Sequence, residues 1–275
     1  MMPMTSTTTT EFDRTTMPTP IDGRPGEFSV ELDPAWSSLV GIHGGYMCAI
    51  AVRGVESLAD DRTVRTITTS FLRTGQIGPA TLSVRELRRG RSLSTVVADL
   101  IQDERIVITS RMTLLIERPG IEWDVAAPVD LPPPAKCERF EMAGRVSHFG
   151  QVDSRWDPAR MPFVRDDGRA LVRGHIRPIE PRPLDAAWLT MASDWFPPPA
   201  FARLAPPTGG VSIDLTTHIH RPHLVLRDDD WLAAEFEIEQ SSAALAVEHG
   251  RIVQQDGLIV VESLQTRLTD QEPPQ

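Results

Sequence analysis

Only a few groups of residues in this sequence have the side-chain types and the spacing needed for catalysis or metal binding. Cys48 follows His43 by five residues, so one helix could present a thiol and a base, although buried cysteines in helices are mostly inert. His218, His220 and His223 could contact a metal ion, but their spacing is loose and no cysteine or well-placed carboxylate completes the set. The sequence lacks the Gly-x-Ser-x-Gly turn of serine hydrolases, a phosphate-binding glycine loop and a dinucleotide fingerprint. We therefore expect no metal and no cofactor.

A glycine pair, Gly44 and Gly45, directly follows His43. Each glycine inside a helix costs about 1 kcal/mol relative to alanine, so the pair indicates that another group approaches the backbone closely. A carbonyl group there could accept hydrogen bonds from backbone N–H groups near the positive end of the helix dipole, which would form an oxyanion hole. Tight packing of the helix on a sheet explains the pair equally well. His43 could act as a base or a donor, although a packed, hydrogen-bonded histidine is the commoner case.

The periodicity of apolar residues predicts the elements that position these groups. Residues 1–22 have no apolar period, so we expect a disordered tail outside the fold. A short strand begins at Glu27, and Asp33 followed by Pro34 is typical of a helix start. This helix is predicted to reach Val55, with the glycine pair in its middle. Runs with a period of two residues then predict an antiparallel meander over 64–72, 80–87, 93–102 and 106–115.

A second unit follows a Pro-rich stretch, residues 119–140, which is predicted to be an extended linker. Two short strands, at 146–149 and 170–175, and a helix over 183–196 precede four further β-rich runs: 211–220, 231–240, 243–254 and 258–268. The two halves overlay with Phe71 on Ile219, an offset of 148 residues, which indicates an internal duplication. Pairing the units edge to edge would protect the open sheet edge of each. The alternative is two unrelated units of similar size.

The predicted strand over 211–220 has one polar face. Its even-numbered residues, among them Ser212 and two histidines, share that face, whereas Leu215 and Ile219 lie on the other. For most of these polar residues beyond Ser212, a solvent-exposed side of the sheet explains the pattern.

The composition narrows the classes of function. The 275 residues include 28 Lys and Arg against 38 Asp and Glu, a net charge of −10, which disfavours nucleic acids and anionic membranes as partners. Hydrophobic residues make up 40% and can form a core, yet none of their runs approaches the length of a membrane-spanning helix. Two cysteines and an N-terminus without a signal-peptide pattern lead us to expect a cytoplasmic protein.

Several motifs together resemble the double-hotdog acyl-CoA thioesterases, the TesB-like type II family. In chain order they are His43-Gly44-Gly45-Tyr46, residues 70–75, residues 88–92, Ala192-Ser193-Asp194, residues 212–222, residues 255–257 and Ser263-Leu264-Gln265. The resemblance spans about residues 26–268. It implies an α+β fold with two hotdog units, each a long helix wrapped by an antiparallel sheet, at residues 23–118 and 141–270. It also implies a homo-oligomer.

The same resemblance implies hydrolysis of an acyl-CoA thioester by a bound water molecule. The family's Asp, Ser or Thr, and Gln correspond here to Asp194, Ser212 and Gln265, with Ser212 where many relatives have Thr. Apolar neighbours of Asp194 in the sequence would make its carboxylate a better base by desolvation, whereas a helix cap is the bland alternative. Ser212 and Gln265 can orient the water while Asp194 takes its proton. The overlay puts Val64 and Met112 at the matching places of the first half, so one site per chain is implied.

Substrate binding is expected at the first helix and at two arginines. Relatives usually have Gln after the glycine pair, whereas this chain has Tyr46. Arg73 and Arg91, near strand ends and turns, are candidates to bind the phosphates of coenzyme A, although arginines there are more often simply solvated. The acyl tail needs an apolar groove between helix and sheet.

Two other functions compete with hydrolysis. Hotdog enoyl hydratases need an Asp and a His in a Gly-Asp-x-Asn-Pro-like setting, which this sequence lacks. An acyl-CoA-binding or regulatory protein would keep the pocket without the chemistry. Retention of all three polar residues argues against it, whereas Tyr46 in place of Gln favours it.

Overall fold

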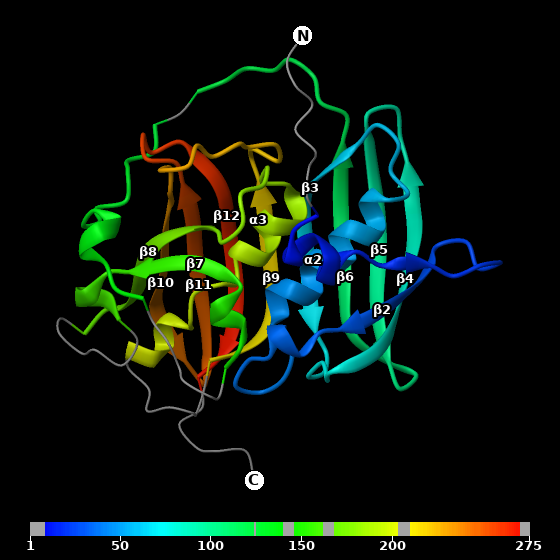
Figure 1. Ribbon diagram of the computed structural model, residues 1–275, viewed down its shortest axis with the longest axis horizontal. Coiled ribbons are helices and arrows are strands. Elements are labelled where there is room, and N and C mark those ends of the chain that lie inside the picture. The colour runs from blue at the N-terminus through cyan, green and yellow to red at the C-terminus, as the bar shows by residue number, and fades with distance from the viewer. Residues whose placement is uncertain (1–8, 124, 140–145, 162–167, 203–209, 270–275) are drawn as a thin grey trace.

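A single antiparallel sheet runs through both halves of the protein (Figure 1). The computed structural model describes residues 9–123, 125–139, 146–161, 168–202 and 210–269. Twelve described strands follow the order β1-β2-β4-β5-β6-β3-β9-β12-β11-β10-β8-β7. The first half contributes β1 (Thr19–Pro20), β2 (Glu27–Leu32), β3 (Thr63–Phe71), β4 (Gly78–Arg89), β5 (Leu93–Gln102) and β6 (Arg105–Leu115). The second half contributes β7 (Val152–Trp156), β8 (Ala170–Pro178), β9 (Val211–Ile219), β10 (Leu232–Ser242), β11 (Leu245–Val253) and β12 (Ile259–Leu268). The eight predicted β-rich runs of the two meanders are confirmed to within two residues.

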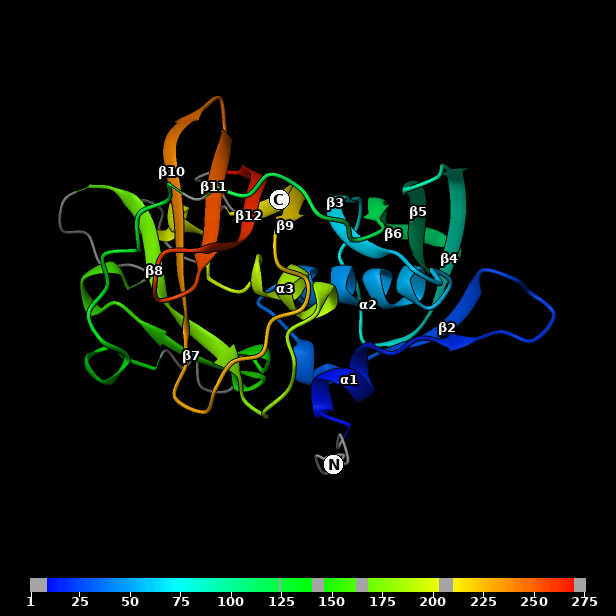
Figure 2. The ribbon, with the colours of Figure 1, turned by 90° about the horizontal axis from the view of Figure 1, so that it is seen from above.

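The helices α2 (Gly44–Glu56) and α3 (Ala186–Ala192) contact each other on one face of this sheet, with the short α1 (Glu11–Thr16) beside them (Figure 2). The core fills the space between these helices and the sheet. Five short 3-10 helices complete the described structure: η1 (Pro34–Trp36), η2 (Pro134–Lys136), η3 (His148–Gly150), η4 (Pro158–Arg160) and η5 (Pro199–Ala202). Among the described residues, no helix is both long and apolar enough to cross a lipid bilayer.

The two halves join where β3 pairs with β9. Thr68 lies opposite Thr216, and their hydroxyl groups form a hydrogen bond of 3.2 Å. Thr66 pairs with His218 and Ser70 pairs with Asp214. An offset of 148 residues relates Thr66 to Asp214 and Ser70 to His218, so it converts one pair into the other. The offset predicted from the sequence is therefore the register of the junction, with a pseudo-two-fold axis at the Thr68–Thr216 pair. The predicted edge-to-edge pairing of two similar units is confirmed.

The N-terminal segment departs from the expected tail. Thr10 caps α1 through a capping box with Asp13, and Phe12 is buried in the main core. The hydroxyl group of Tyr46 donates to the carbonyl oxygen of Thr15 at 2.8 Å. The prediction that residues 1–22 lie outside the fold is thus wrong for α1 and for β1, which pairs with β2, while residues 1–8 lie outside the described part of the chain. A six-residue helix has too little period to detect, and tertiary contacts hold it.

The first long helix starts later than predicted. Asp33 caps only η1, by accepting a hydrogen bond from the N–H of Ala35 at 2.8 Å. Gly41 has φ = +148°, and a Cβ there would lie 2.6 Å from the carbonyl oxygen of Gly75. The chain therefore cannot stay helical through Gly41, and α2 begins at Gly44. This places the glycine pair in the first turn rather than in the middle of the helix.

Two predictions in the second half also need correction. The strand expected at 146–149 is η3, and the nearest strand is β7, which starts at Val152. The helix expected over 183–196 is confined to α3, so Asp194 lies in the turn after its last residue. The connection predicted over 119–140 has no strand among its described residues. It runs along one end of the sheet from the first half to the second (Figure 1).

Candidate active site

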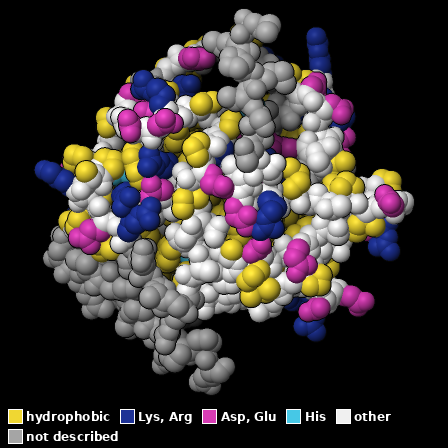
Figure 3. All heavy atoms as spheres, viewed as in Figure 1, with side chains coloured by type: hydrophobic (Ala, Val, Ile, Leu, Met, Phe, Trp, Pro, Cys, Tyr) yellow, Lys and Arg dark blue, Asp and Glu magenta, His cyan; other side chains and the backbone are white. Residues whose placement is uncertain are grey.

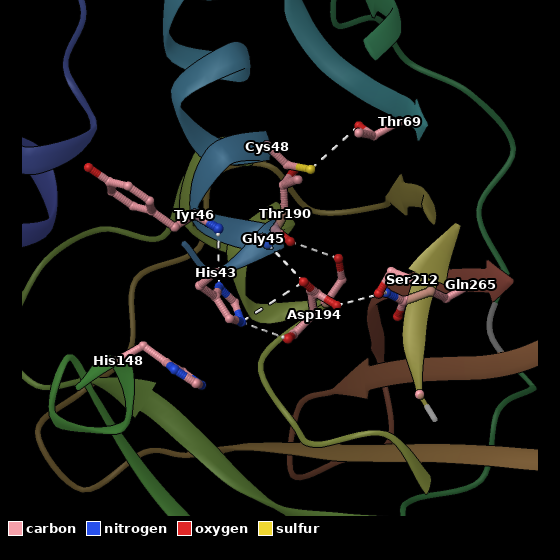
Figure 4. A network of polar contacts seen from close by, with 12 residues as sticks. His43, Gly45, Tyr46, Cys48, Thr69, His148, Thr190, Asp194, Ser212 and Gln265 are labelled. Carbon is pink, nitrogen blue, oxygen red and sulfur yellow. Dashed lines mark hydrogen bonds and ion pairs between the residues drawn. The ribbon is translucent and has the colours of Figure 1, made fainter. Parts of the chain in front are cut away.

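Asp194 lies where the turn after α3 meets the first turn of α2 (Figure 4). Its Oδ2 accepts a hydrogen bond from the backbone N–H of Gly45 at 2.8 Å, and its Oδ1 accepts one from Nε2 of Gln265 at 2.8 Å. The side chain is only 9% exposed. A helix N-terminus favours a negative charge at this position. The carboxylate is therefore fixed in orientation and still borders a cavity.

Ser212 and Gln265 reach Asp194 from the adjacent strands β9 and β12. Nε2 of Gln265 donates to Oγ of Ser212 at 2.6 Å as well as to Asp194 (Figure 4). Gln265 is almost fully buried, whereas Ser212 is half-buried and lines the cavity. The structure thus brings together the three residues that the resemblance implied, although 53 and 71 residues separate the bonded pairs.

A bulge in β9 gives Ser212 its orientation. The ladder passes from the Thr266–Asp214 pair directly to the Arg267–Ser212 pair, so Ile213 is an extra residue in β9. If β9 had no bulge and Ile213 alternated regularly, Ser212 would face outward with Asp214. The bulge turns its hydroxyl group to the inner face, toward Gln265. Alternation alone grouped Ser212 with residues that lie on the opposite side of the sheet.

His43 caps α2 and holds the backbone of Asp194. Its Nδ1 accepts the N–H of Tyr46 at 3.2 Å, so Nε2 carries the ring proton and donates it to the carbonyl oxygen of Asp194 at 2.9 Å. Burial lowers the pKa of His43, which keeps the ring neutral. Both ring nitrogens are engaged in this arrangement. His43 is therefore the packed, hydrogen-bonded histidine given above as the commoner case, and its ring holds the backbone of Asp194.

The glycine pair allows α3 and Asp194 to approach α2. A Cβ on Gly45 would lie 2.7 Å from the carbonyl oxygen of Met191, and one on Gly44 would lie 2.7 Å from Oδ2 of Asp194. A Cβ on Gly44 would also lie 2.9 Å from the ring of Phe71 in β3, so close packing against α3, the Asp194 carboxylate and the sheet requires both glycines. The N–H of Gly45 is occupied by that carboxylate, so the oxyanion role expected for Gly45 does not fit this arrangement. Gly44 lines the cavity.

The side chain of Tyr46 packs in the hydrophobic core and not at the candidate site. Its ring stacks on Trp36 with centroids 4.7 Å apart, it is fully buried, and its hydroxyl group bonds to Thr15 of α1. In Figure 4 its side chain points away from Asp194. The expectation that Tyr46 contacts substrate is therefore not met.

Cys48 is no partner for His43. Its side chain extends toward Thr69, with 3.4 Å between Sγ and the hydroxyl oxygen (Figure 4), and burial raises the pKa of the thiol to about 12. The histidines considered above as metal ligands do not converge on one point. His220 pairs with Glu262, whereas His218 lies beside Thr66. Within the described ranges, no group of His, Cys, Asp and Glu side chains could hold a metal ion.

A cavity of about 380 Å³ opens beside Asp194. Its polar lining includes the side chains of Asp194, Ser212 and Arg267 together with His43 and His148. Its apolar lining comes from both halves and includes Leu39, Val40, Ile42, Met47, Phe71, Leu72, Phe149, Trp195, Phe196 and Phe201. The volume is within the usual range for small-molecule pockets, about 300–1,000 Å³. The cavity is therefore a mostly apolar pocket formed by both halves of the chain.

The two arginines expected to bind substrate differ in their placement. Arg73 lines the cavity and donates to the carbonyl oxygen of Ile106 at 2.9 Å. Arg91 lies in the turn between β4 and β5 and is not among the residues that line the cavity. On the face shown in Figure 3, basic side chains alternate with acidic ones and do not form one large patch. Of these two arginines, Arg73 borders the cavity and Arg91 does not.

Sequence reasoning missed two site residues, Arg267 and Glu248. Both are buried, and Nε of Arg267 donates to Oε2 of Glu248 at 2.6 Å. They lie at core-facing positions of the adjacent strands β12 and β11. A charged residue at an inward position of each strand was the available signal, because buried charges are rare unless paired.

His148 leads to a prediction about pH. Its ring stacks on that of His43, and burial lowers its pKa to about 3. Between pH 6.5 and that value only the unfolded chain takes up the proton, so the free energy of unfolding should fall as pH decreases through this window. We expect His148→Gln to reduce the fall between pH 7 and pH 5 by about 2 kcal/mol. Urea unfolding at the two pH values measures this.

A suitable control is His249→Gln, which removes an exposed imidazole from β11. An equal pH dependence of unfolding in wild type and His148→Gln would contradict the burial of a neutral ring.

Comparisons with known proteins agree with this architecture. Residues 32–115 match the family model for the acyl-CoA thioesterase N-terminal domain, and residues 127–269 match that for the C-terminal domain. A hot dog fold protein of unknown function from Alicyclobacillus acidocaldarius superposes with a TM-score of 0.85 at 22% identity, covering 98% of this chain and 100% of that one. The acyl-CoA thioesterase II TesB2 from Mycobacterium marinum has a TM-score of 0.74 at 19% identity, covering 95% and 98%. At these identities the likeness shows the double hotdog fold. No curated protein sequence matches the chain.

Proposed function

We propose that this chain, which belongs to the acyl-CoA thioesterase family, hydrolyses acyl-CoA thioesters to a free acid and coenzyme A. The observation that carries the proposal is the Asp194 carboxylate at the wall of an apolar cavity, held by Gln265 and Gly45 and next to Ser212. A carboxylate held in this way is a suitable general base for a water molecule. The family supplies the thioester as the expected substrate.

The reaction proceeds by attack of a water molecule on the thioester carbonyl carbon. Asp194 takes a proton from the water as its oxygen forms the new C–O bond, and a tetrahedral oxyanion results. Collapse of this intermediate breaks the C–S bond, and the proton held by Asp194 passes to the leaving thiolate. Ser212 contacts the reactants and Gln265 orients Asp194 and Ser212, and neither becomes covalently bound to the acyl group.

We expect the two ends of the substrate to bind at different parts of the cavity. Its aromatic and aliphatic lining receives the acyl group, since burial of apolar surface is favourable. Leu39 and Val40 line the cavity and are 40% and 64% exposed, so they mark its opening to solvent. Arg73 is suited to contact a coenzyme A phosphate beyond this opening. The expected homo-oligomer remains a prediction.

A panel of acyl-CoAs from acetyl to palmitoyl, assayed for release of free thiol, tests the function. We expect protein-dependent hydrolysis of at least one member of the panel, with a rate proportional to protein concentration. Binding of acyl-CoA without release of thiol from any member would support the acyl-CoA-binding alternative and contradict the proposal.

A further inference from the structure

The guanidinium group of Arg267 is at the centre of a buried network in the wall of the site, with Nη2 3.7 Å from Oδ1 of Asp194. Nε and Nη2 donate to the two oxygens of Glu248 at 2.6 and 3.3 Å. Nη2 also donates to Oε1 of Gln265 at 2.7 Å, and Nη1 donates to Oγ of Ser212 at 3.1 Å and to the carbonyl oxygen of Gly210 at 2.9 Å. The side chains of Arg267 and Glu248 are 4% and 3% exposed. All five N–H groups of a guanidinium are thus used within the protein, which leaves none for substrate.

These contacts fix which end of the Gln265 amide faces Asp194. The amide oxygen accepts from Arg267, so the amide nitrogen must face Asp194 and Ser212. A reversed amide would place its NH₂ group against the guanidinium and its oxygen against the carboxylate. Both contacts would be repulsive, because guanidinium only donates and carboxylate only accepts hydrogen bonds.

The same contacts determine how Ser212 can act. Its Oγ accepts from Gln265 and from Arg267, which uses both lone pairs of a hydroxyl oxygen. Only its proton remains available for a hydrogen bond, and Ser212 borders the cavity. Ser212 is therefore a donor toward the cavity, suited to the water oxygen or to the oxyanion, and not an acceptor of a proton from the water.

The carboxylate of Glu248 stabilises the buried positive charge of Arg267. A guanidinium group with so little exposure needs a counter-charge, and removal of one partner leaves the other charge buried and unpaired. Replacement of both partners by apolar residues is often neutral for stability, so stability alone gives no reason to retain this pair.

We propose that Arg267, held by Glu248, is a positioning residue that sets the hydrogen-bond polarity of the site. It directs the Gln265 amide nitrogen to Asp194 and makes Ser212 a donor into the cavity. This inference rests on the proposed hydrolysis. It goes beyond the implied trio because it assigns the direction of each hydrogen bond in the trio to residues outside it.

The decisive variant removes both charges at once, Arg267→Met with Glu248→Met. We expect it to fold with a Tm close to that of wild type, while kcat for acyl-CoA hydrolysis falls by about 10²-fold and KM changes little, because misplaced groups act on the transition state. Arg267→Lys keeps the charge but cannot make all five bonds, so its kcat should also fall at least about tenfold. The matched control is Arg251→Met with Glu235→Met, an ion pair of 3.0 Å outside the cavity lining, and its kcat should not change.

Wild-type kcat in the folded double variant would overturn the proposal, as would equal losses in the control. An inactive wild type would count against the proposed hydrolysis. The positioning role of Arg267 can still be tested by a measurement that does not depend on activity. That measurement is the hydrogen exchange of the Gln265 side-chain amide by nitrogen-15 NMR. We expect this amide to be protected in wild type and exposed to exchange in the double variant. Equal protection in the two proteins would refute the role of Arg267.

Discussion

Replacement of Asp194 by Asn should lower kcat for acyl-CoA hydrolysis by about 10²-fold or more, with little change in KM. Asn preserves the shape of the side chain but cannot take a proton from water. Its single oxygen also cannot accept from both Gly45 and Gln265, which bind different oxygens of the carboxylate. Proton transfer and water positioning act in the transition state, so the loss should appear in kcat. Initial rates of thiol release across substrate concentrations separate kcat from KM.

Asp214→Asn is the matched control for this change. Asp214 is on the same strand as Ser212, but its carboxylate accepts a hydrogen bond from Thr266 at 3.0 Å and does not border the cavity. Its removal takes away one negative charge near the site without touching Asp194, and kcat should stay near the wild-type value. Near wild-type hydrolysis by Asp194→Asn, at an unchanged Tm, would remove Asp194 from the mechanism.

Much of the fold could be predicted because its strands are half-buried and alternate in polarity. The eight long runs with period two all form strands, and the overlay of Phe71 on Ile219 gave the offset that relates the paired residues of β3 and β9. A duplicated unit repeats its pattern along the chain, and this repetition is visible without any knowledge of contacts.

The elements that escaped prediction depend on contacts distant in sequence. α1 is too short to show a period and is ordered by contacts with Trp36 and Tyr46. The late start of α2 follows from the packing of Gly41 against Gly75, two segments that only the fold brings together. The bulge at Ile213 leaves no signal in the alternation of β9, although it decides which way Ser212 faces.

The residue types of the candidate site could be predicted from the sequence, whereas the hydrogen bonds between them could not. Asp194, Ser212 and Gln265 were named through the resemblance, and the structure brings them into hydrogen-bond contact. Arg267 and Glu248 were missed because the role of a buried charged residue can be inferred only when its partner on the next strand is known. Sequence gives the chemical groups, whereas the direction of each hydrogen bond requires the register of β9, β11 and β12.

The most direct test of the account is a double-mutant cycle in which kcat is measured for wild type, Asp194→Asn, Gln265→Ala and the double variant. If Gln265 acts by orienting the Asp194 carboxylate toward one water, each single change should reduce kcat by about 10²-fold and the double variant should be at most about threefold slower than the slower single variant. The reason is that Asp194→Asn already removes the carboxylate that Gln265 orients. Single-turnover rates with protein in excess of acyl-CoA keep slow variants measurable. Multiplicative losses, about 10⁴-fold in the double variant, would show that Asp194 and Gln265 act independently and would contradict the shared site.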